Sequence, residues 1–193
     1  MPALAFGFAM LALGCSSGTS KKQPDPEAGY RKALAATNPS VARTVKPGST
    51  DEQRAIERFV DFYKVFSADV VKNHVRETYA AGAYFRDPFH EVIGIDAIEK
   101  YFLDSTETFH ECRFDIEDVA KHDGNYYFRW VMHLKLEKDD PVMDTIGLTH
   151  VRFDELGMIS FHQDYWDAGS AVYEKIPLLG SLVRFVKGRI RGG

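Results

Sequence analysis

Residues 112–166 read CRFDIEDVAKHDGNYYFRWVMHLKLEKDDPVMDTIGLTHVRFDELGMISFHQDYW. This stretch contains four segments rich in β-branched and aromatic residues, a composition typical of strands: 112–121, 126–137, 143–154 and 158–166. Short runs of turn-forming residues, such as Asp123-Gly124-Asn125, separate the segments. Because strands joined by short turns pair in antiparallel fashion, the stretch predicts an antiparallel meander.

The residues before this meander show helical periodicity. Apolar residues recur at helical spacing over 51–67, directly after a capping-box pattern at 49–52. A second helix is predicted at 69–78, and a third begins after Gly94. Residues 83–89 have the pattern of a short strand that ends at a proline. Helices followed by an antiparallel meander predict an α+β fold.

The N-terminal region has two parts of different composition. Residues 1–15 contain an uncharged apolar run of signal-peptide length, too short to cross a bilayer as a helix. The run ends in LALGC, which resembles the lipobox of bacterial lipoproteins and predicts lipidation at Cys15, hence a secreted, membrane-anchored protein of the cell envelope. A plain signal peptide with an incidental cysteine is the alternative. Residues 16–48 are rich in Ser, Pro and Lys and predict a flexible linker.

The C-terminal region, 171–193, mixes large apolar residues with five basic residues and one acidic residue, a net charge of +4. This pattern predicts a basic amphipathic helix, and Pro177 and Gly180 predict a break near 176–180. One interpretation places the helix on an anionic membrane surface. The other has it cover an apolar face of the sheet or join a dimer.

Composition limits the remaining possibilities. The 193 residues are 45% hydrophobic, which suits a single domain, here 49–170. The net charge of −4 argues against a nucleic-acid partner. The sequence contains neither a glycine-rich phosphate loop nor histidine and cysteine spacing typical of a metal site, so we predict no cofactor and no metal.

Two segments carry a family resemblance. Phe85-Arg86-Asp87-Pro88, followed by Gly94 and a helix, resembles the segment of ketosteroid isomerases that holds the catalytic aspartate. VRFDELGMI at 151–159, followed by Tyr165-Trp166, resembles their last hairpin. Tyr63 precedes Asp87 by 24 positions, as the oxyanion-binding tyrosine of that family precedes its base.

Together, these matches over 51–170 identify the chain as a member of the nuclear-transport-factor-2-like (NTF2-like) superfamily, in its SnoaL-like and ketosteroid-isomerase-like branch. The resemblance implies a cone in which three N-terminal helices pack on a curved, mainly antiparallel sheet that encloses a pocket. It also implies a homodimer, because the exposed sheet face of this superfamily commonly dimerises.

The resemblance further implies which side chains point into the pocket from the sheet: Phe128, Trp130, Met132, Thr149, Val151, Ser160, His162, Asp164 and Trp166. Ile159, Phe161 and Tyr165 then face the other way and need cover from a partner or from the C-terminal helix. An aromatic cup with a few polar groups is the usual form of a small-molecule site, so we expect a small hydrophobic ligand.

Four residues are the candidate catalytic groups. Asp87 would act as a general base, Tyr63 would donate a hydrogen bond to an oxyanion, and His162 with Asp164 would shuttle a proton. Each has a structural alternative: a turn aspartate, a core tyrosine and a buried hydrogen-bonded pair.

Two departures leave the reaction open. Thr149 stands where ketosteroid isomerases carry a protonated aspartic acid, a role that a threonine hydroxyl fills less strongly. QDYWD at 163–167 resembles the RDYFD segment of limonene-epoxide-hydrolase-like proteins, but Trp130-Val131-Met132 replaces their Arg-x-Asp pair. The sequence therefore predicts an isomerase or hydrolase acting on a carbonyl compound or an epoxide, with a ligand-binding module or a protein-interaction module as the alternatives.

Overall fold

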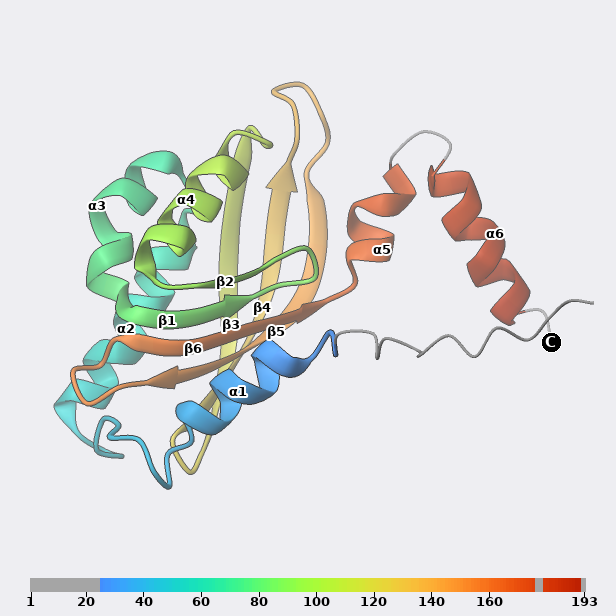
Figure 1. The fold of residues 1–193 in the computed structure, drawn as a ribbon. Coiled ribbons are helices and arrows are strands. Elements are labelled where there is room, and N and C mark those ends of the chain that lie inside the picture. Colours follow the sequence, from blue (N-terminus) through green and yellow to red (C-terminus); the bar gives the residue numbers. More distant parts are fainter. Residues whose placement is uncertain (1–24, 176–178, 192–193) are drawn as a thin grey trace, which may run out of the picture.

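The computed structural model describes residues 25–175 and 179–191, and its fold is α+β (Figure 1). The helices are α1 (Ala28–Ala36), α2 (Thr50–Lys64), α3 (Ala68–Thr78), α4 (Ile95–Thr106), α5 (Ala168–Ala171) and α6 (Leu179–Arg191), with a 3-10 turn η1 at Tyr173–Lys175. The strands are β1 (Tyr79–Arg86), β2 (Glu91–Ile93), β3 (Glu111–His122), β4 (Asn125–Lys135), β5 (Met143–Phe153) and β6 (Ile159–Trp166).

The six strands form one sheet in the order β2-β1-β6-β5-β4-β3, with α2, α3 and α4 packed against one side (Figure 1). Strands β3 to β6 pair antiparallel in sequence order, so the predicted meander is confirmed. The early strand β1 lies parallel to β6, and this pairing joins the helical half of the chain to the meander. The sheet keeps two free edges, β2 and β3, and is not closed into a barrel.

The predicted N-terminus of the long helix is confirmed. The side chain of Ser49 accepts a hydrogen bond from the backbone N–H of Glu52 at 3.1 Å. The Glu52 carboxylate accepts from the backbone N–H of Gly48 at 2.8 Å, one residue earlier than a capping box requires.

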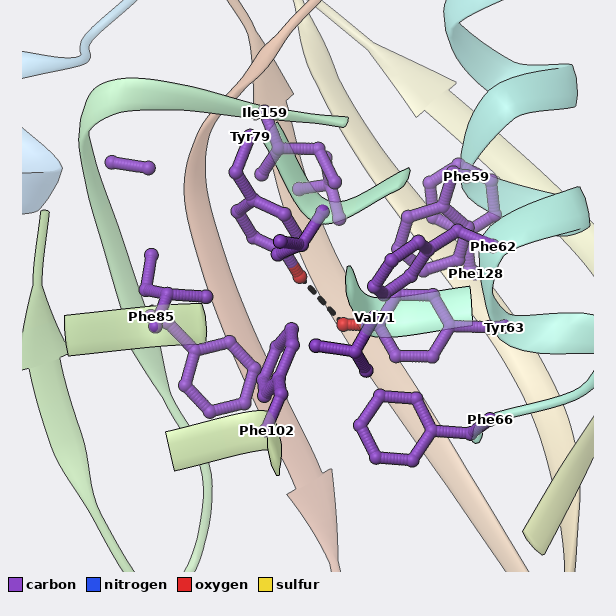
Figure 2. Close-up of a cluster of buried hydrophobic side chains, with 14 of the residues drawn as sticks. Phe59, Phe62, Tyr63, Phe66, Val71, Tyr79, Phe85, Phe102, Phe128 and Ile159 are labelled. Carbon is purple, nitrogen blue, oxygen red and sulfur yellow. Dashed lines mark hydrogen bonds between the residues drawn. The ribbon is translucent and has the colours of Figure 1, made fainter. Parts of the chain in front are cut away.

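Aromatic side chains build the core between these helices and the sheet. Figure 2 shows rings from α2, β1, α4 and β4 converging on one cluster. Phe59 of α2 stacks on Phe128 of β4 with ring centroids 3.9 Å apart. Burial of one such side chain stabilises a fold by roughly 1.5–3 kcal/mol, so this cluster fixes how α2 lies on the sheet.

Helix α1 corrects the prediction of a flexible linker over 16–48 for residues 25–48, while residues 16–24 lie outside the described residues. Residues 28–36 form a helix, and Val45 is buried. The ring of Tyr30 lies 6.0 Å from that of Phe161, and Arg152 Nη1 donates to the carbonyl oxygen of Leu34 at 2.6 Å. The helix is rich in alanine and contains no fully buried residue, so its sequence gave only a weak apolar period.

The same helix changes the expected cover of the outer sheet face. Phe161 is buried beneath α1. Ile159 was predicted on this face, but it lies in the core because the β5–β6 pairing shifts register between Arg152 and Phe153. A β-bulge of this kind moves a side chain to the opposite face of its strand.

The C-terminal region contains α5, η1 and α6, so the predicted helical region is interrupted before Leu179, as the expected break near 176–180 implies. Lys187 Nζ of α6 bonds Glu174 Oε1 at 2.7 Å, which ties α6 to η1. In the part of the chain that the structure describes, no helix has the length and apolarity to cross a membrane. The predicted signal peptide and Cys15 lie outside the described residues.

Candidate functional site

A cavity of about 380 Å³ lies between α2, α4 and the inner face of the sheet. Its lining is mainly aromatic and aliphatic. Six predicted site residues line it: Tyr63, Asp87, Trp130, Met132, Asp164 and Trp166. Four of the other predicted residues are buried behind this lining: Phe128, Thr149, Val151 and His162. Ser160, also predicted to point into the pocket, does not line the cavity, and its hydroxyl donates to the carbonyl oxygen of Arg152 at 3.1 Å. An apolar cavity with a few converging polar groups is the usual form of a small-molecule site.

Asp87 lies just after β1, in the loop that leads to β2. Its Oδ1 accepts hydrogen bonds from the backbone N–H groups of Phe89 and His90, at 2.8 and 2.7 Å. Its Oδ2 accepts from the hydroxyl of Tyr101, a residue of α4 that the sequence analysis did not identify. Asp87 therefore shapes the turn, as its structural alternative proposed, and also presents a carboxylate to the cavity.

The pKa of Asp87 is raised above its ordinary value. Burial is the largest cause, because a charged carboxylate loses hydration in the cavity. The hydrogen bonds from Tyr101 and the two backbone N–H groups oppose this effect, and the nearby charge of Asp164 adds to it. A carboxylate with a raised pKa is a stronger base than the same group in water.

Tyr63 connects to the second carboxylate through a chain of hydrogen bonds. The Tyr63 hydroxyl bonds the Tyr79 hydroxyl at 2.5 Å, as Figure 2 shows, and the Tyr79 hydroxyl bonds His162 Nδ1 at 2.9 Å. His162 Nε2 then bonds Asp164 Oδ1 at 2.9 Å. Burial raises the pKa of both tyrosines well above 10.0, so both remain phenols at neutral pH.

The direction of this chain depends on how many protons the His162–Asp164 pair holds. With a neutral imidazole that donates from Nε2 to Asp164, Nδ1 accepts from Tyr79, and Tyr79 accepts from Tyr63. Tyr63 then has no proton left for a ligand. With one additional proton, both imidazole nitrogens donate: Nε2 still donates to Asp164, and Nδ1 now donates to Tyr79. Tyr79 then donates to Tyr63, which frees the Tyr63 proton to point into the cavity.

Thr149 does not take the role predicted for it. Trp130 Nε1 donates to Thr149 Oγ1 at 2.8 Å, and the Thr149 hydroxyl donates to Asp164 Oδ1. Its proton is therefore committed to Asp164, and the residue does not line the cavity. Sequence alternation correctly placed Thr149 on the inner face but could not show that the indole of Trp130 lies in front of it.

Asp164 has one oxygen occupied and one open. Oδ1 accepts from both His162 and Thr149. Within the described residues, Oδ2 accepts no hydrogen bond from the protein, and the residue lines the cavity. This oxygen is thus available to a water molecule or a ligand.

Tyr79 and Tyr101 are the site residues that sequence reasoning missed. Tyr79 is the first residue of β1 and reaches His162 only because β1 lies parallel to β6. Tyr101 lies on the buried side of α4, a helix for which only the apolar residues were considered. Helical spacing from the predicted start after Gly94 could have placed Tyr101 near Asp87.

Comparisons with known proteins agree with this fold. The family model of the SnoaL-like domain matches residues 56–162, more than half of the chain. No protein of curated function matches the sequence.

Solved structures share the fold at low sequence identity. A limonene-epoxide-hydrolase-like (LEH-like) epoxide hydrolase of M. tuberculosis has 13% identity and a TM-score of 0.53, over 76% of this chain and 100% of that one. A protein described as a SnoaL-like polyketide cyclase from Jannaschia sp. CCS1 has 16% identity and a TM-score of 0.53, over 67% of this chain and 94% of that one. An NTF2-like protein of unknown function from Burkholderia pseudomallei has 9% identity and a TM-score of 0.55, over 63% of this chain and 95% of that one.

At these identities the structural likeness establishes the fold, and the matched family model establishes the family. The chain belongs to the SnoaL-like domain family, within the NTF2-like fold.

Proposed function

We propose that this domain is an enzyme that performs acid–base chemistry on a compact hydrophobic carbonyl compound or epoxide. One observation carries the proposal: the aromatic cavity presents two carboxylates and two phenols, and hydrogen bonds link Tyr63 to Asp164 and Tyr101 to Asp87. Such a pairing of a base with an oxygen-directed donor is what proton transfer next to a carbonyl requires.

With a carbonyl substrate, Asp87 removes the proton from the carbon next to the carbonyl group. The electron pair of the broken C–H bond forms an enolate, and its negative charge develops on the carbonyl oxygen. Tyr63 donates a hydrogen bond to that oxygen when the His162–Asp164 pair holds the additional proton. Asp87 then returns its proton to another carbon, which completes an isomerisation with no net loss of protons.

With an epoxide, the two carboxylates exchange roles. The open Oδ2 of Asp164 takes a proton from water, whose oxygen attacks an epoxide carbon. In this scheme Asp87 starts in its protonated form, which the upward shift of its pKa favours, and donates to the oxygen that leaves this carbon. The product is a diol, and proton transfer from Asp164 back to Asp87 through solvent restores the starting state.

The experiment compares turnover of β,γ-unsaturated cyclic ketones, followed by the absorbance of the conjugated enone, with hydrolysis of cyclic epoxides, followed by diol formation. We expect Asp87→Asn to lower kcat by about 10²–10⁴-fold on the class that is turned over. Asp139→Asn, on the exposed loop between β4 and β5, is the matched control and should leave kcat unchanged. A substrate turned over equally well by wild type, Asp87→Asn and Asp164→Asn would refute the proposal.

A ligand-binding module is the second candidate, and the commitment of the Thr149 proton to Asp164 favours it. The cavity then lacks the second oxyanion donor of ketosteroid isomerases. A native mass spectrum of the purified chain distinguishes the two functions. A carrier retains a ligand of constant mass and keeps it in Asp87→Asn, whereas an enzyme releases product.

For location, we propose that Cys15 is acylated and anchors the domain to the envelope. The LALGC sequence at 11–15 supports this proposal. In a bacterial host, Cys15→Ser should move the protein from the membrane fraction to the soluble fraction. Equal membrane recovery of both forms, with no lipid mass on Cys15, would contradict it.

A further inference from the structure

The C-terminal segment forms part of the cavity rim. Val172 lines the cavity beside Phe89 and Trp166. The ring of Phe89 packs edge-on against Trp166 at 5.3 Å and against Tyr173 at 5.9 Å, measured between ring centroids. We call Phe89, Trp166 and Tyr173 the aromatic rim. Phe89 and Tyr173 are exposed to solvent, so the entrance to the cavity is itself an apolar surface.

Helix α6 carries further exposed apolar side chains together with positive charge. Phe185 and Val186 are 59% and 49% exposed, and the Arg189 guanidinium lies over the Phe185 ring, 5.3 Å from its centroid. The helix contains four basic residues and no acidic residue. In Figure 1, α6 stands away from the sheet, and its packing contacts are with η1.

We propose that α6 and the aromatic rim form one surface that docks on an anionic phospholipid bilayer. A helix with exposed Phe and Val beside Arg and Lys, in a chain of net charge −4, is complementary to a layer of lipid phosphates above acyl chains. The rim belongs to the cavity entrance, so the ligand class drawn from docking rests on the proposed function, whereas docking itself is measured without any substrate.

The course of the N-terminal chain supports the same orientation. The Glu27 carboxylate pairs with the guanidinium of Arg86, the residue before Asp87, so the described chain begins on the same side as the rim loop. Only nine residues lie between Cys15 and Asp25, and the ten steps from one to the other reach at most roughly 35 Å when fully extended. An anchor at Cys15 would therefore hold the rim and α6 close to the bilayer.

Docking would place the cavity entrance against the lipid. A hydrophobic ligand dissolved in the bilayer could then enter past Phe89 and Tyr173 without crossing water. The ligand class implied is a membrane-partitioned compound rather than a freely soluble metabolite.

The test uses the full chain carrying Cys15→Ser, with a bimane fluorophore on a single introduced cysteine. Gly188→Cys places the label on α6, where an added side chain meets no atom within 4 Å. Leu156→Cys, 76% exposed at the β5–β6 turn, is the control position. The native Cys112 is buried, and burial raises its thiol pKa to about 12, so it does not compete for the label.

We expect the label on α6 to shift to shorter wavelength with vesicles of equimolar phosphatidylglycerol and phosphatidylcholine, and the control label to stay unchanged. Arg189→Glu in the α6-labelled chain should weaken vesicle binding about tenfold or more, since it reverses a charge at the surface. Arg43→Glu, on the loop before α2, should not.

Three results would overturn the proposal. The α6 label could fail to shift, or shift equally with pure phosphatidylcholine. Both labels could shift together, which would indicate binding through the first residues of the chain. The α6 label could change with protein concentration in the absence of vesicles, which would identify α6 as a contact between two copies.

Discussion

Tyr79 is the residue on which the hydrogen-bond chain depends. Tyr79→Phe removes the hydroxyl between Tyr63 and His162 and leaves buried His162 Nδ1 without its partner. An unsatisfied buried group costs about 1–3 kcal/mol, so we expect a loss of this size in the free energy of unfolding, measured by urea denaturation. Turnover should also fall, because Tyr63 loses its hydrogen-bonded connection to His162 and Asp164.

Tyr84→Phe is the matched control for this substitution. The Tyr84 hydroxyl is buried, but it makes no hydrogen bond of normal geometry to the described residues. Its removal should change the free energy of unfolding by less than about 0.5 kcal/mol. Equal losses in the two variants would show that the hydrogen-bond chain contributes nothing to stability.

Asp87 provides a second prediction at this scale, from the sign of its pKa shift. A carboxyl whose folded-state pKa is raised above 3.8 favours folding only while it is protonated. That contribution is complete below pH 3.8 and is lost as the pH rises through the raised value. Asp87→Asn cannot ionise. The free energy of unfolding of Asp87→Asn minus that of wild type should therefore be larger at pH 7 than at pH 4. Urea denaturation at both values tests this, and the opposite order would contradict it.

At the scale of elements, two buried basic residues, His150 and Arg152, lie next to Phe161 on the sheet face that α1 covers. His150 Nε2 and Arg152 Nε both bond Asn125 Oδ1, at 2.9 and 2.7 Å. Burial first, and then the charges of Arg152 and His162, lower the pKa of His150 to about 4. The folded protein therefore keeps this imidazole neutral in a range where the unfolded chain binds a proton.

Stability should consequently rise with pH between about 4 and 6.5, and be lost as the pH falls through that range. At about 1.36 kcal/mol for each pKa unit, His150 contributes up to about 3 kcal/mol of this dependence. His150→Gln keeps a donor for Asn125 and should flatten the dependence in denaturation experiments. If wild type and His150→Gln lost stability in parallel, another group would be responsible.

The elements also show what sequence could and could not predict. The meander and α2 were predictable because β-branched runs, short turns and an apolar helical period each operate within a few residues. Strand β2 has three residues, too few for a pattern. Helix α1 depends on Phe161 and Arg152, more than 110 positions away, and so carries no local signal. The bulge that buries Ile159 is likewise a property of the pairing with β5.

The candidate site shows the same contrast between features that local sequence predicts and features that depend on contacts between distant elements. Asp87, Tyr63 and Asp164 followed from family resemblance and strand alternation, which fix the face on which a residue lies. Other features depend on side-chain contacts between elements. These are the hydrogen bond from Thr149 to Asp164, the bond between Tyr79 and His162, and the bond from Tyr101 to Asp87. Such contacts decide the chemistry and were not available from residue spacing.

At the scale of the whole molecule, α1 bears on the predicted homodimer. It covers Phe161 and reaches Tyr165, whose hydroxyl lies 3.4 Å from that of Tyr30. A superfamily dimer through this face would have to form around α1. The homodimer stays a prediction, and sedimentation equilibrium of the full chain carrying Cys15→Ser measures it directly.

The most direct test of the central claim is hydrogen exchange on a ligand. A β,γ-unsaturated cyclic ketone is incubated with the protein in deuterium oxide, and loss of the proton signal next to the carbonyl is followed by NMR. If Asp87 is a base in the cavity, wild type accelerates exchange, Asp87→Asn abolishes the acceleration and Asp139→Asn retains it. Binding of the ketone without any acceleration, or equal acceleration by Asp87→Asn, would contradict acid–base catalysis at this site.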